Sequence, residues 1–261
     1  MTVTIVTAYY KIKSKASPET YKEWFQNFFK LNIKVVCFTD EESLQYLNPP
    51  HNWHVVVQPV DEWKIQSHRS WFEQCKQYDF EKYHTVDLYM LWCNKPYFVQ
   101  QAIKLNPFNS DIFAWVDIGS VRNSHTLACA SNFPNKLPSL LEGNKCMFVS
   151  IEPHNFNLDK DKTFLTCFDL SLEQYYHRKS VVNWIQGTFF AVSKTSFTNF
   201  LSDYELCLND HIEGKRFCGK DQIIFSTMAA KHPSYLKILN AVDVKDCPIQ
   251  DKWFAFYSLC S

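Results

Sequence analysis

The sequence of 261 residues predicts an α/β fold, in which helices flank a mostly parallel central sheet, in a single domain. Three observations lead to this prediction. A short apolar run at residues 3–7 is followed by an amphipathic helix pattern, and a second run rich in β-branched residues follows at 34–39. Further strand-like runs lie at 53–58 and 111–119. Strand, helix and strand in this order open a parallel, doubly wound sheet.

The first helix is predicted from its N-terminus. Ser17 can cap it, and Pro18 suits the first helical position because proline lacks the N–H that would be unpaired there. The polar segment 11–17 before the helix is predicted to be a loop. Five aromatic residues recur at the spacing of one helix face, which we expect to pack on the sheet: Tyr21, Trp24, Phe25, Phe28 and Phe29.

A mostly helical stretch is predicted over residues 67–104, with Pro96 within it. Proline kinks a helix or starts a new one, so the helix either runs through residue 96 or begins again there. In the first case Lys95 interrupts an apolar face, and in the second it lies at a helix N-terminus, where anions are favoured. Lys95 is therefore a candidate phosphate contact, unless its stem packs and its ammonium reaches water.

The second half of the chain supplies the remaining elements. The segment 123–138 is rich in Asn, Ser and Pro, which predicts a surface loop beside the site. A long loop in such a place often covers the site. The other predicted elements are strands at 146–151 and 188–192, helices at 194–208 and 221–231, and a turn at 214–219.

Composition excludes several classes of function. Lys plus Arg number 27 and Asp plus Glu also 27, so no net charge draws the chain to nucleic acid or to an anionic membrane. The 5 glycines form neither of the phosphate-binding loops of dinucleotide-binding and P-loop enzymes. The 10 cysteines include no C-x-x-C pair, which argues against a clustered zinc site and is typical of reduced thiols in a core.

The N-terminus begins with a strand-like run and has no basic region before its apolar stretch, so no signal peptide is predicted. No apolar run approaches the roughly 20 residues that a helix needs to cross a bilayer. We therefore expect a cytoplasmic protein with no membrane span and no nucleic-acid partner.

The apolar run at 111–119 ends on Asp117, Ile118 and Gly119. A buried strand of this kind places Asp117 at its carboxyl end, where open α/β sheets bind their ligands. Gly119 has no Cβ, so a ligand or another backbone can approach it closely. Asp117 is thus a candidate for a metal or phosphate site. A solvated aspartate that closes the strand is the alternative.

Short motifs along the chain resemble those of a known family. They are Val-Thr-Ala-Tyr-Tyr at 6–10, Tyr-Lys-Glu-Trp-Phe-Gln-Asn-Phe at 21–28, Val-Cys-Phe-Thr-Asp at 36–40, Asn-Lys-Pro at 94–96, Asn-Pro-Phe at 106–108, Trp-Val-Asp-Ile-Gly at 115–119, Gln-Gly-Thr-Phe-Phe at 186–190 and Asp-Gln at 221–222. In order and spacing they resemble the HtrL/YibB-type (WlaTC/HtrL) glycosyltransferases. The resemblance implies a GT-A-like fold, with a nucleotide-sugar-binding half at 1–120 and an acceptor-binding half at 121–261.

The resemblance also implies a reaction. A hexose or pentose would pass from a UDP- or GDP-linked donor to a hydroxyl of a glycan or glycoconjugate. The leaving group is a diphosphate, whose charge needs either Mn²⁺ or Mg²⁺ on carboxylates or Lys and Arg side chains.

By this resemblance Asp117 would hold the metal, although Gly119 stands where the D-x-D motif of GT-A enzymes has its second acid. His232 is a candidate further metal ligand, as a C-terminal His is in many GT-A enzymes. In the alternative, Asp117 contacts the ribose or the sugar while Lys95 or Arg122 binds the phosphates.

The first two strand ends are candidate contacts of the nucleotide. Thr7, Ala8 and Tyr9 would flank it, with Tyr9 or Tyr10 stacked on its base. Asp40 would accept hydrogen bonds from the base or the ribose, and is equally suited to cap a helix.

Three segments of the second half complete the candidate site. Gln186 and Gly187 would form a wall for the donor sugar or the acceptor, or else a plain turn. Asp221 is the candidate general base that takes the proton of the acceptor hydroxyl, or else a helix cap. The segment 152–154 is a further candidate acceptor contact.

Two other functions stay open from the sequence. The many Trp and Tyr residues and the incomplete D-x-D motif also suit a non-catalytic nucleotide-sugar- or carbohydrate-binding protein. A phosphohydrolase with Asp117 as its nucleophile is less favoured, because such enzymes usually carry this Asp on the first strand, where this chain has Thr7.

Overall fold

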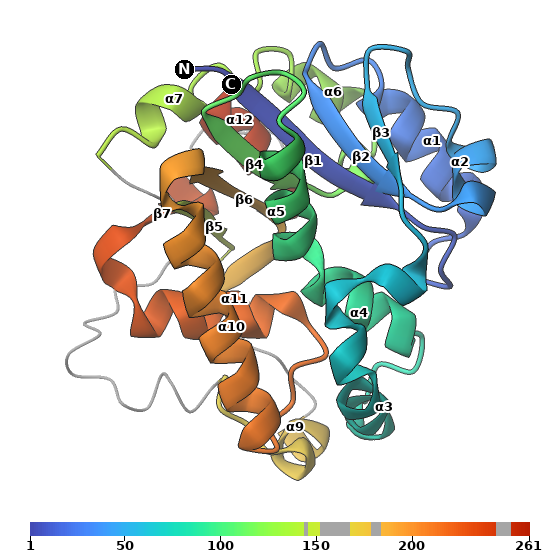
Figure 1. Cartoon of the computed structure of the whole chain (residues 1–261), viewed down its shortest axis with the longest axis vertical. Coiled ribbons are helices and arrows are strands. Elements are labelled where there is room, and N and C mark those ends of the chain that lie inside the picture. Colours follow the sequence, from blue (N-terminus) through green and yellow to red (C-terminus); the bar gives the residue numbers. More distant parts are fainter. Residues whose placement is uncertain (144–145, 152–167, 179–183, 244–251) are drawn as a thin grey trace.

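The computed structural model describes residues 1–143, 146–151, 168–178, 184–243 and 252–261, and seven strands of this part form one sheet (Figure 1). The strand segments are rich in β-branched and aromatic residues, which pack well on a pleated surface. Their order across the sheet is β3-β2-β1-β4-β6-β5-β7. The strands are β1 (Val3–Tyr9), β2 (Val35–Thr39), β3 (His54–Val57), β4 (Ile112–Val116), β5 (Cys146–Ser150), β6 (Ile185–Ser193) and β7 (Leu236–Asn240).

Most neighbouring strands run parallel. β1 pairs in parallel with β2 and β4, β2 with β3, and β5 with β7. β6 is the exception, because it runs antiparallel to both β4 and β5. The pairing of Val116 with Phe189 brings the first part of β6 beside the end of β4. The predicted α/β fold with a mostly parallel sheet is confirmed.

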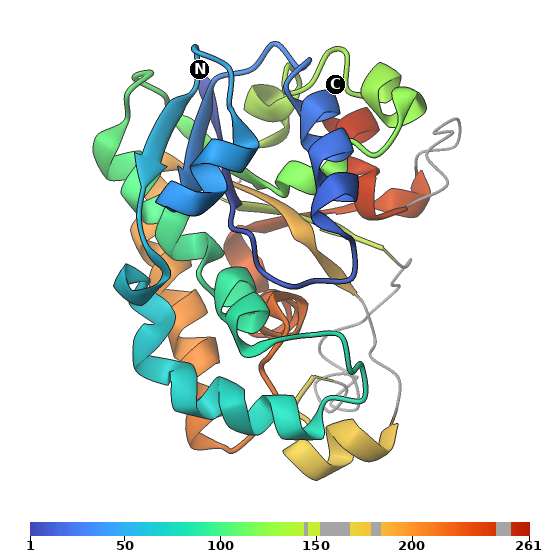
Figure 2. The same cartoon turned by 90° about the vertical axis from the view of Figure 1, so that its right-hand side faces the viewer.

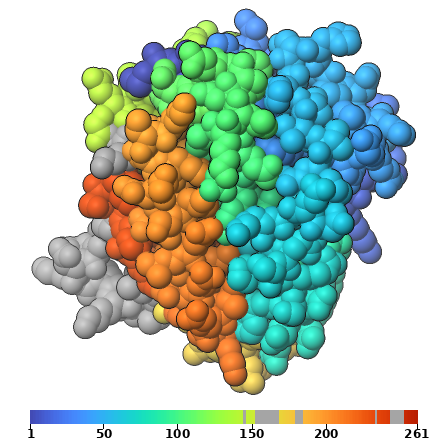
Figure 3. All heavy atoms as spheres, viewed as in Figure 1, coloured from blue at the N-terminus to red at the C-terminus, as the bar shows by residue number. Residues whose placement is uncertain are grey.

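Helices cover both faces of the sheet (Figures 1 and 2). Alternate residues of a strand face opposite ways, so the sheet separates two apolar cores, with Val6 in the first and Ile5 in the second. α5 and α10 lie side by side over the first core (Figure 3). This core is covered by α3 (Arg69–Tyr78), α4 (Val86–Cys93), α5 (Lys95–Leu105), α10 (Phe197–Glu213) and α11 (Asp221–Lys231). The second is covered by α1 (Pro18–Phe28), α6 (Ser124–Cys129), α7 (Leu137–Leu140) and α12 (Phe256–Cys260).

Shorter elements connect these layers. α2 (Glu41–Leu47) follows β2, and α9 (Leu172–Arg178) contacts α3. Within the described ranges, none of the helices combines the length and the apolar character needed to cross a membrane. The 3₁₀ turns are Val60–Glu62, Lys64–His68, Ile118–Ser120, Lys194–Ser196, Pro233–Tyr235, Ala241–Asp243 and Lys252–Phe254.

Two helix starts agree with the sequence. In α1, Ser17 Oγ accepts a hydrogen bond from Thr20 N, and Pro18 is the first helical residue. α4 ends at Cys93 and α5 begins at Lys95, so a new helix starts with Lys95 and Pro96 instead of one helix running through Pro96. Of the two alternatives for this stretch, the one that places Lys95 at a helix N-terminus is correct.

The loop predicted at 123–138 is partly wrong. Asn123 Oδ1 accepts a hydrogen bond from Thr126 N and begins α6, and α7 begins at Leu137. Asn123, which suggested a loop, is a helix cap, because its side chain pairs with a free helical N–H group. The segment 152–154 lies outside the described residues.

Candidate functional site

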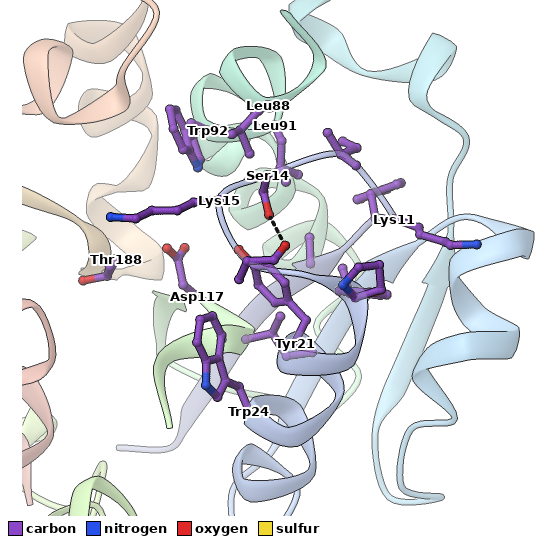
Figure 4. Close-up of a pocket in the computed structure, with 18 of the residues that line it drawn as sticks. Lys11, Ser14, Lys15, Tyr21, Trp24, Leu88, Leu91, Trp92, Asp117 and Thr188 are labelled. Carbon is purple, nitrogen blue, oxygen red and sulfur yellow. Dashed lines mark hydrogen bonds between the residues drawn. The ribbon is translucent and has the colours of Figure 1, made fainter. Parts of the chain in front are cut away.

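A pocket of about 600 Å³ opens at the carboxyl ends of β1 and β4 (Figure 4). From β1 the chain passes to β2 on one side, whereas β4 pairs with β1 on the other side. Such a change of direction is the point at which open α/β sheets bind ligands. Ala8 and Tyr9 line the pocket from β1, and Asp117 and Gly119 line it from the segment after β4.

Two helices and a loop form the walls. Leu91 and Trp92 of α4 lie on one side, and Tyr21 and Trp24 of α1 lie on the other (Figure 4). The loop between β1 and α1 runs past α4 (Figure 2), and every residue from 10 to 17 lines the pocket. The predicted loop 11–17 is therefore a wall of the site.

Lys95 lies at the base of the pocket, at the first position of α5, and is only 2% exposed. Its Nζ is 3.0 Å from Asp117 Oδ1 and 2.7 Å from Asp221 Oδ2. It also donates a hydrogen bond of 2.8 Å to the carbonyl of Gly187. An ammonium has three N–H groups, the same number as the oxygens around it. The end of β4, the first part of β6 and the start of α11 thus meet at one ammonium.

The two carboxylates differ in exposure. Asp117 Oδ1 also accepts a hydrogen bond of 2.7 Å from Trp115 Nε1, and its side chain is 32% exposed. Asp221 Oδ1 accepts a hydrogen bond from the backbone N–H of Gln222, and its side chain is 3% exposed. Asp117 therefore faces the pocket, whereas Asp221 lies behind Lys95.

Lys95, Asp117 and Asp221 form an ion cluster, in which burial and charge have opposite effects on the pKa values. Burial by itself would lower the pKa of Lys95, but Asp117 and Asp221 outweigh it and raise that pKa, so the ammonium stays charged at neutral pH. Burial raises the pKa of Asp221, and the charge of Lys95 offsets this only in part.

The raised pKa of Asp221 predicts a pH-dependent stability. Between the ordinary value of 3.8 and the raised pKa, the folded protein holds a proton that the unfolded chain releases, so the free energy of unfolding falls as pH rises through this interval. Urea unfolding of wild type and Asp221→Asn measures it. The stability of wild type relative to the variant should be highest at the acid end, fall with rising pH and then level off. A difference independent of pH would contradict this.

Gly187 makes room for Asp221. A Cβ at residue 187 would lie 2.3 Å from Asp221 Oδ1, far inside van der Waals contact. A glycine inside a strand often marks such a close approach. Gly187 is within β6, not in the turn that was its sequence alternative, and both its carbonyl and its missing side chain serve the ion cluster.

Gly119 likewise permits a close approach, though by the protein itself. A Cβ there would lie 2.9 Å from Cε1 of Tyr21 and 3.1 Å from Cε3 of Trp24. The turn Ile118–Ser120 therefore packs directly on α1. This contact fixes Asp117 relative to the aromatic wall of the pocket.

Cations outnumber carboxylates in the pocket lining. Lys11 pairs with Glu42 at 3.0 Å and points away from the pocket (Figure 4). Neither Lys13 nor Lys15 has an ion pair with a described residue, and Lys15 Nζ lies 5.8 Å from the centroid of the Tyr83 ring. Among the described residues that line the pocket, one carboxylate, Asp117, accompanies five basic side chains: Lys11, Lys13, Lys15, Lys95 and Arg122.

Arg122 is held between two rings. Its guanidinium carbon lies 4.5 Å from the centroid of Trp24 and 4.7 Å from that of Phe254. The faces of aromatic rings attract a guanidinium. Arg122 is thus a cation fixed in the wall of the pocket.

The predicted nucleotide contacts divide into two groups. Ala8, Tyr9, Lys95, Asp117 and Gly119 line the pocket. Thr7 and Gln186 are buried within strands and, with Asp40 and Gly187, do not line it. Asp40 Oδ1 accepts a hydrogen bond from Ser43 N, so Asp40 caps α2, which was the alternative predicted for this residue.

The tyrosines after β1 offer little ring surface to a base. Tyr9 is 5% exposed and packs edge-on against Phe25, and Tyr10 is 4% exposed and packs edge-on against Trp63. Their rings belong to the two cores. Tyr21, which lines the same pocket, is half-buried and leaves more of its side chain exposed.

His232 is not brought to Asp117. It directly follows α11, whereas Asp221 begins that helix, and eleven residues of helix span about 16 Å. The Nδ1 atom of His232 lies 3.7 Å from Asp203 Oδ1. The side chains that meet at Lys95 thus do not include His232.

The space between Asp117 and Asp221 does not suit a divalent cation. Its Oδ1 and the Oδ2 of Asp221 both contact the Lys95 ammonium, and a second positive ion between them would meet strong repulsion. A Mn²⁺ or Mg²⁺ held between Asp117 and Asp221 would have to share these oxygens with the ammonium of Lys95.

One cluster of described residues does have a geometry that suits a metal. Single ligand atoms of Asp79, Glu81 and His84 lie within 4.8 Å of one another, outside the pocket lining. His84 Nδ1 contacts Asp79 Oδ2 at 2.6 Å, and Glu81 pairs with Lys220. A metal there would compete with an ammonium for Glu81. In the structure this cluster ties the segment before α11 to the segment after α3.

Two features of the site have little or no signal in the sequence. Lys13 and Lys15 lie in a loop that was predicted only as a connection, and the structure shows that this loop lines the pocket. The only signal in the sequence was the alternation of lysines at 11, 13 and 15, because alternate residues of an extended segment point the same way. The contact of Arg122 with Trp24 had no signal in their spacing along the chain.

Comparisons with known proteins complete the description of the site. No curated protein matches the chain. Among solved structures, mouse xyloside xylosyltransferase 1 in its apo form is similar with a TM-score of 0.47 and 12% identity, over 98% of this chain and 94% of the other. The 4-diphosphocytidyl-2C-methyl-D-erythritol synthase of Anaerococcus prevotii DSM 20548 is similar with a TM-score of 0.43 and 11% identity, over 99% and 97%.

The sequence also matches a family model. The model described as "Bacterial protein of unknown function (HtrL_YibB)" matches residues 57–261, which is more than half of the chain. The resemblance found in the short motifs is thereby confirmed, and the protein belongs to the HtrL_YibB family.

Proposed function

We propose that this protein is a glycosyltransferase that moves a sugar from a UDP- or GDP-linked donor to a hydroxyl of a glycan or glycoconjugate. One observation carries the proposal. At the change of direction in the sheet, a pocket brings Lys13, Lys15 and Arg122 to the same space as the carboxylate of Asp117. Cations suit a diphosphate, and a carboxylate suits the hydroxyls of a sugar or ribose.

The diphosphate would be bound by the cations that the ion cluster does not use. Lys95 already faces two carboxylates, so its charge is matched inside the protein. The loop lysines Lys13 and Lys15 line the pocket and form no ion pair with a described residue, and Arg122 lines the same pocket. Charge-assisted hydrogen bonds from these groups would stabilise the diphosphate as it leaves.

Asp117 would accept a hydrogen bond from a hydroxyl of the donor. Both of its contacts within the protein use Oδ1, which leaves Oδ2 toward the pocket. Trp115 and Lys95 hold the carboxylate in one orientation, and this orientation favours a defined position of the bound sugar. Asp221 lies behind Lys95, so we assign it the role of positioning the ammonium. For the predicted role of general base, the carboxylate of Asp221 would have to reach the pocket.

A second candidate is a protein that binds nucleotide sugars without turning them over. The burial of Asp221 favours this candidate. Among the described residues that line the pocket, it leaves one carboxylate, that of Asp117, to act on a bound donor. Binding of a donor with neither hydrolysis nor transfer would support this candidate.

A panel of UDP- and GDP-sugars tests the proposed function. A ligand that binds only the folded protein raises its melting temperature, and released UDP or GDP reports turnover. We expect Asp117→Asn to weaken donor binding by about 10- to 100-fold, the range for a lost hydrogen bond to a charged group, and to lower turnover.

Asp61→Asn is the matched control, because Asp61 is exposed and does not line the pocket. This control should bind donors like wild type. Equal affinity of the Asp117 variant and wild type would show that Asp117 is not a donor contact. A panel without any shift would refute the proposed donor class.

A further inference from the structure

We propose that the Lys95 ammonium occupies the position at which Asp117 and Asp221 would otherwise hold a divalent cation, so that the donor binds without metal. The identity of the donor rests on the proposed function. The position of the ammonium rests on the structure alone, and the first test below needs no donor.

The oxygens around Lys95 are those that a hard cation prefers. Two carboxylates, from Asp117 and Asp221, and the carbonyl of Gly187 converge on one point from three elements. Carboxylate and carbonyl oxygens are typical ligands of Mg²⁺ and Mn²⁺. Here the point of convergence holds Nζ of Lys95, with each oxygen at 2.7–3.0 Å.

The ammonium is a fixed part of the fold. Lys95 is the first residue of α5, and Pro96 at the next position suits a helix start. The side chain is buried, and the missing side chain of Gly187 gives Asp221 the room to reach Nζ. A flexible surface lysine would move aside for a metal, whereas this one is 2% exposed and is held by three oxygens.

Removal of the ammonium should therefore open a cation site. Without it, two carboxylates and a carbonyl face one another across the space that the lysine side chain occupied. Such a set holds net negative charge and binds a divalent ion unless the fold collapses around it. The Lys95→Ala variant should gain an affinity for Mn²⁺ that wild type lacks.

The test uses Mn²⁺ alone on metal-free protein, with melting temperature and calorimetry as readouts. In millimolar Mn²⁺ we expect a rise in melting temperature for Lys95→Ala and none for wild type. Lys104→Ala, which removes an exposed lysine from the same helix, should behave like wild type. Lys95→Ala combined with Asp117→Asn should lose most of the gain.

Two results would overturn the proposal. One is binding of Mn²⁺ to wild type that Asp117→Asn abolishes, and the other is a folded Lys95→Ala variant that Mn²⁺ does not stabilise. If Lys95→Ala does not fold, calorimetry compares the Mn²⁺ binding of wild type with that of Asp117→Asn. Wild type that binds no Mn²⁺ at Asp117 supports the proposal.

The donor gives an independent readout. A donor found by the panel should bind wild type equally well in EDTA and in Mn²⁺. A loss of about tenfold or more in EDTA that Mn²⁺ restores would overturn the proposal while the proposed function stands. Binding of no donor under either condition would refute the proposed function and leave the Mn²⁺ titration to decide the role of Lys95.

Discussion

Replacement of Lys95 by Met is expected to lower the free energy of unfolding by about 3–5 kcal/mol, the usual cost of removing one partner of a buried ion pair. Met keeps the length and apolar stem of the side chain but leaves Asp221, which is 2% exposed, without its counter-charge. Asp117 should suffer less because it is partly exposed and can be hydrated. Urea unfolding at neutral pH measures the change.

A double variant separates charge from packing. Lys95→Met combined with Asp221→Leu removes both buried charges, and such pairs are often close to neutral in stability. We expect it to recover much of the loss. Lys104→Met, on the exposed side of the same helix, should change stability by less than about 0.5 kcal/mol. A Lys95→Met variant as stable as wild type would show that Asp221 is neutral or hydrated in the folded protein.

Gly187→Ala is expected to destabilise the protein by about 1–3 kcal/mol, the range for an extra methyl in a packed core, and to impair donor binding. The new Cβ would lie 2.3 Å from Asp221 Oδ1, so Asp221 must leave its place beside Lys95. Lys95 would then shift relative to Asp117 and disturb the pocket. Thermal melting and donor titration measure the two effects.

A double-mutant cycle tests the cause. If the clash with Asp221 is responsible, Gly187→Ala should cost less in an Asp221→Ala background, because the side chain that it meets is shorter. Residues in direct contact show coupling of about 0.5–3 kcal/mol. Additive effects of the two substitutions would instead point to strain within β6.

The first half of the fold was predictable because its signals are local. β1 and β2 are short apolar runs, α1 shows the period of a helix, and Ser17 and Pro18 mark the helix start. Strand direction has no such signal. The antiparallel course of β6 depends on which strands it pairs with, and β7, half-buried along its length, did not stand out as a strand.

The ion cluster was predictable only in pieces. Lys95, Asp117 and Asp221 each stood out for a local reason: a helix start, a strand end and a helix start again. Their mutual contact depends on long-range pairing, since β6 and α11 come much later in the chain. The sequence therefore suggested separate roles, as phosphate contact, metal ligand and base, for side chains that the fold joins into one ion cluster.

The setting of Arg122 between Trp24 and Phe254 has a consequence for binding entropy. The ordering of a long side chain on binding costs about 0.5–1.5 kcal/mol. The two rings already restrict the motion of the Arg122 side chain. Lys13 and Lys15, which form no ion pair with a described residue, would still incur that cost. Arg122 is thus suited to fix the orientation of an anion, and the lysines to attract it from solution.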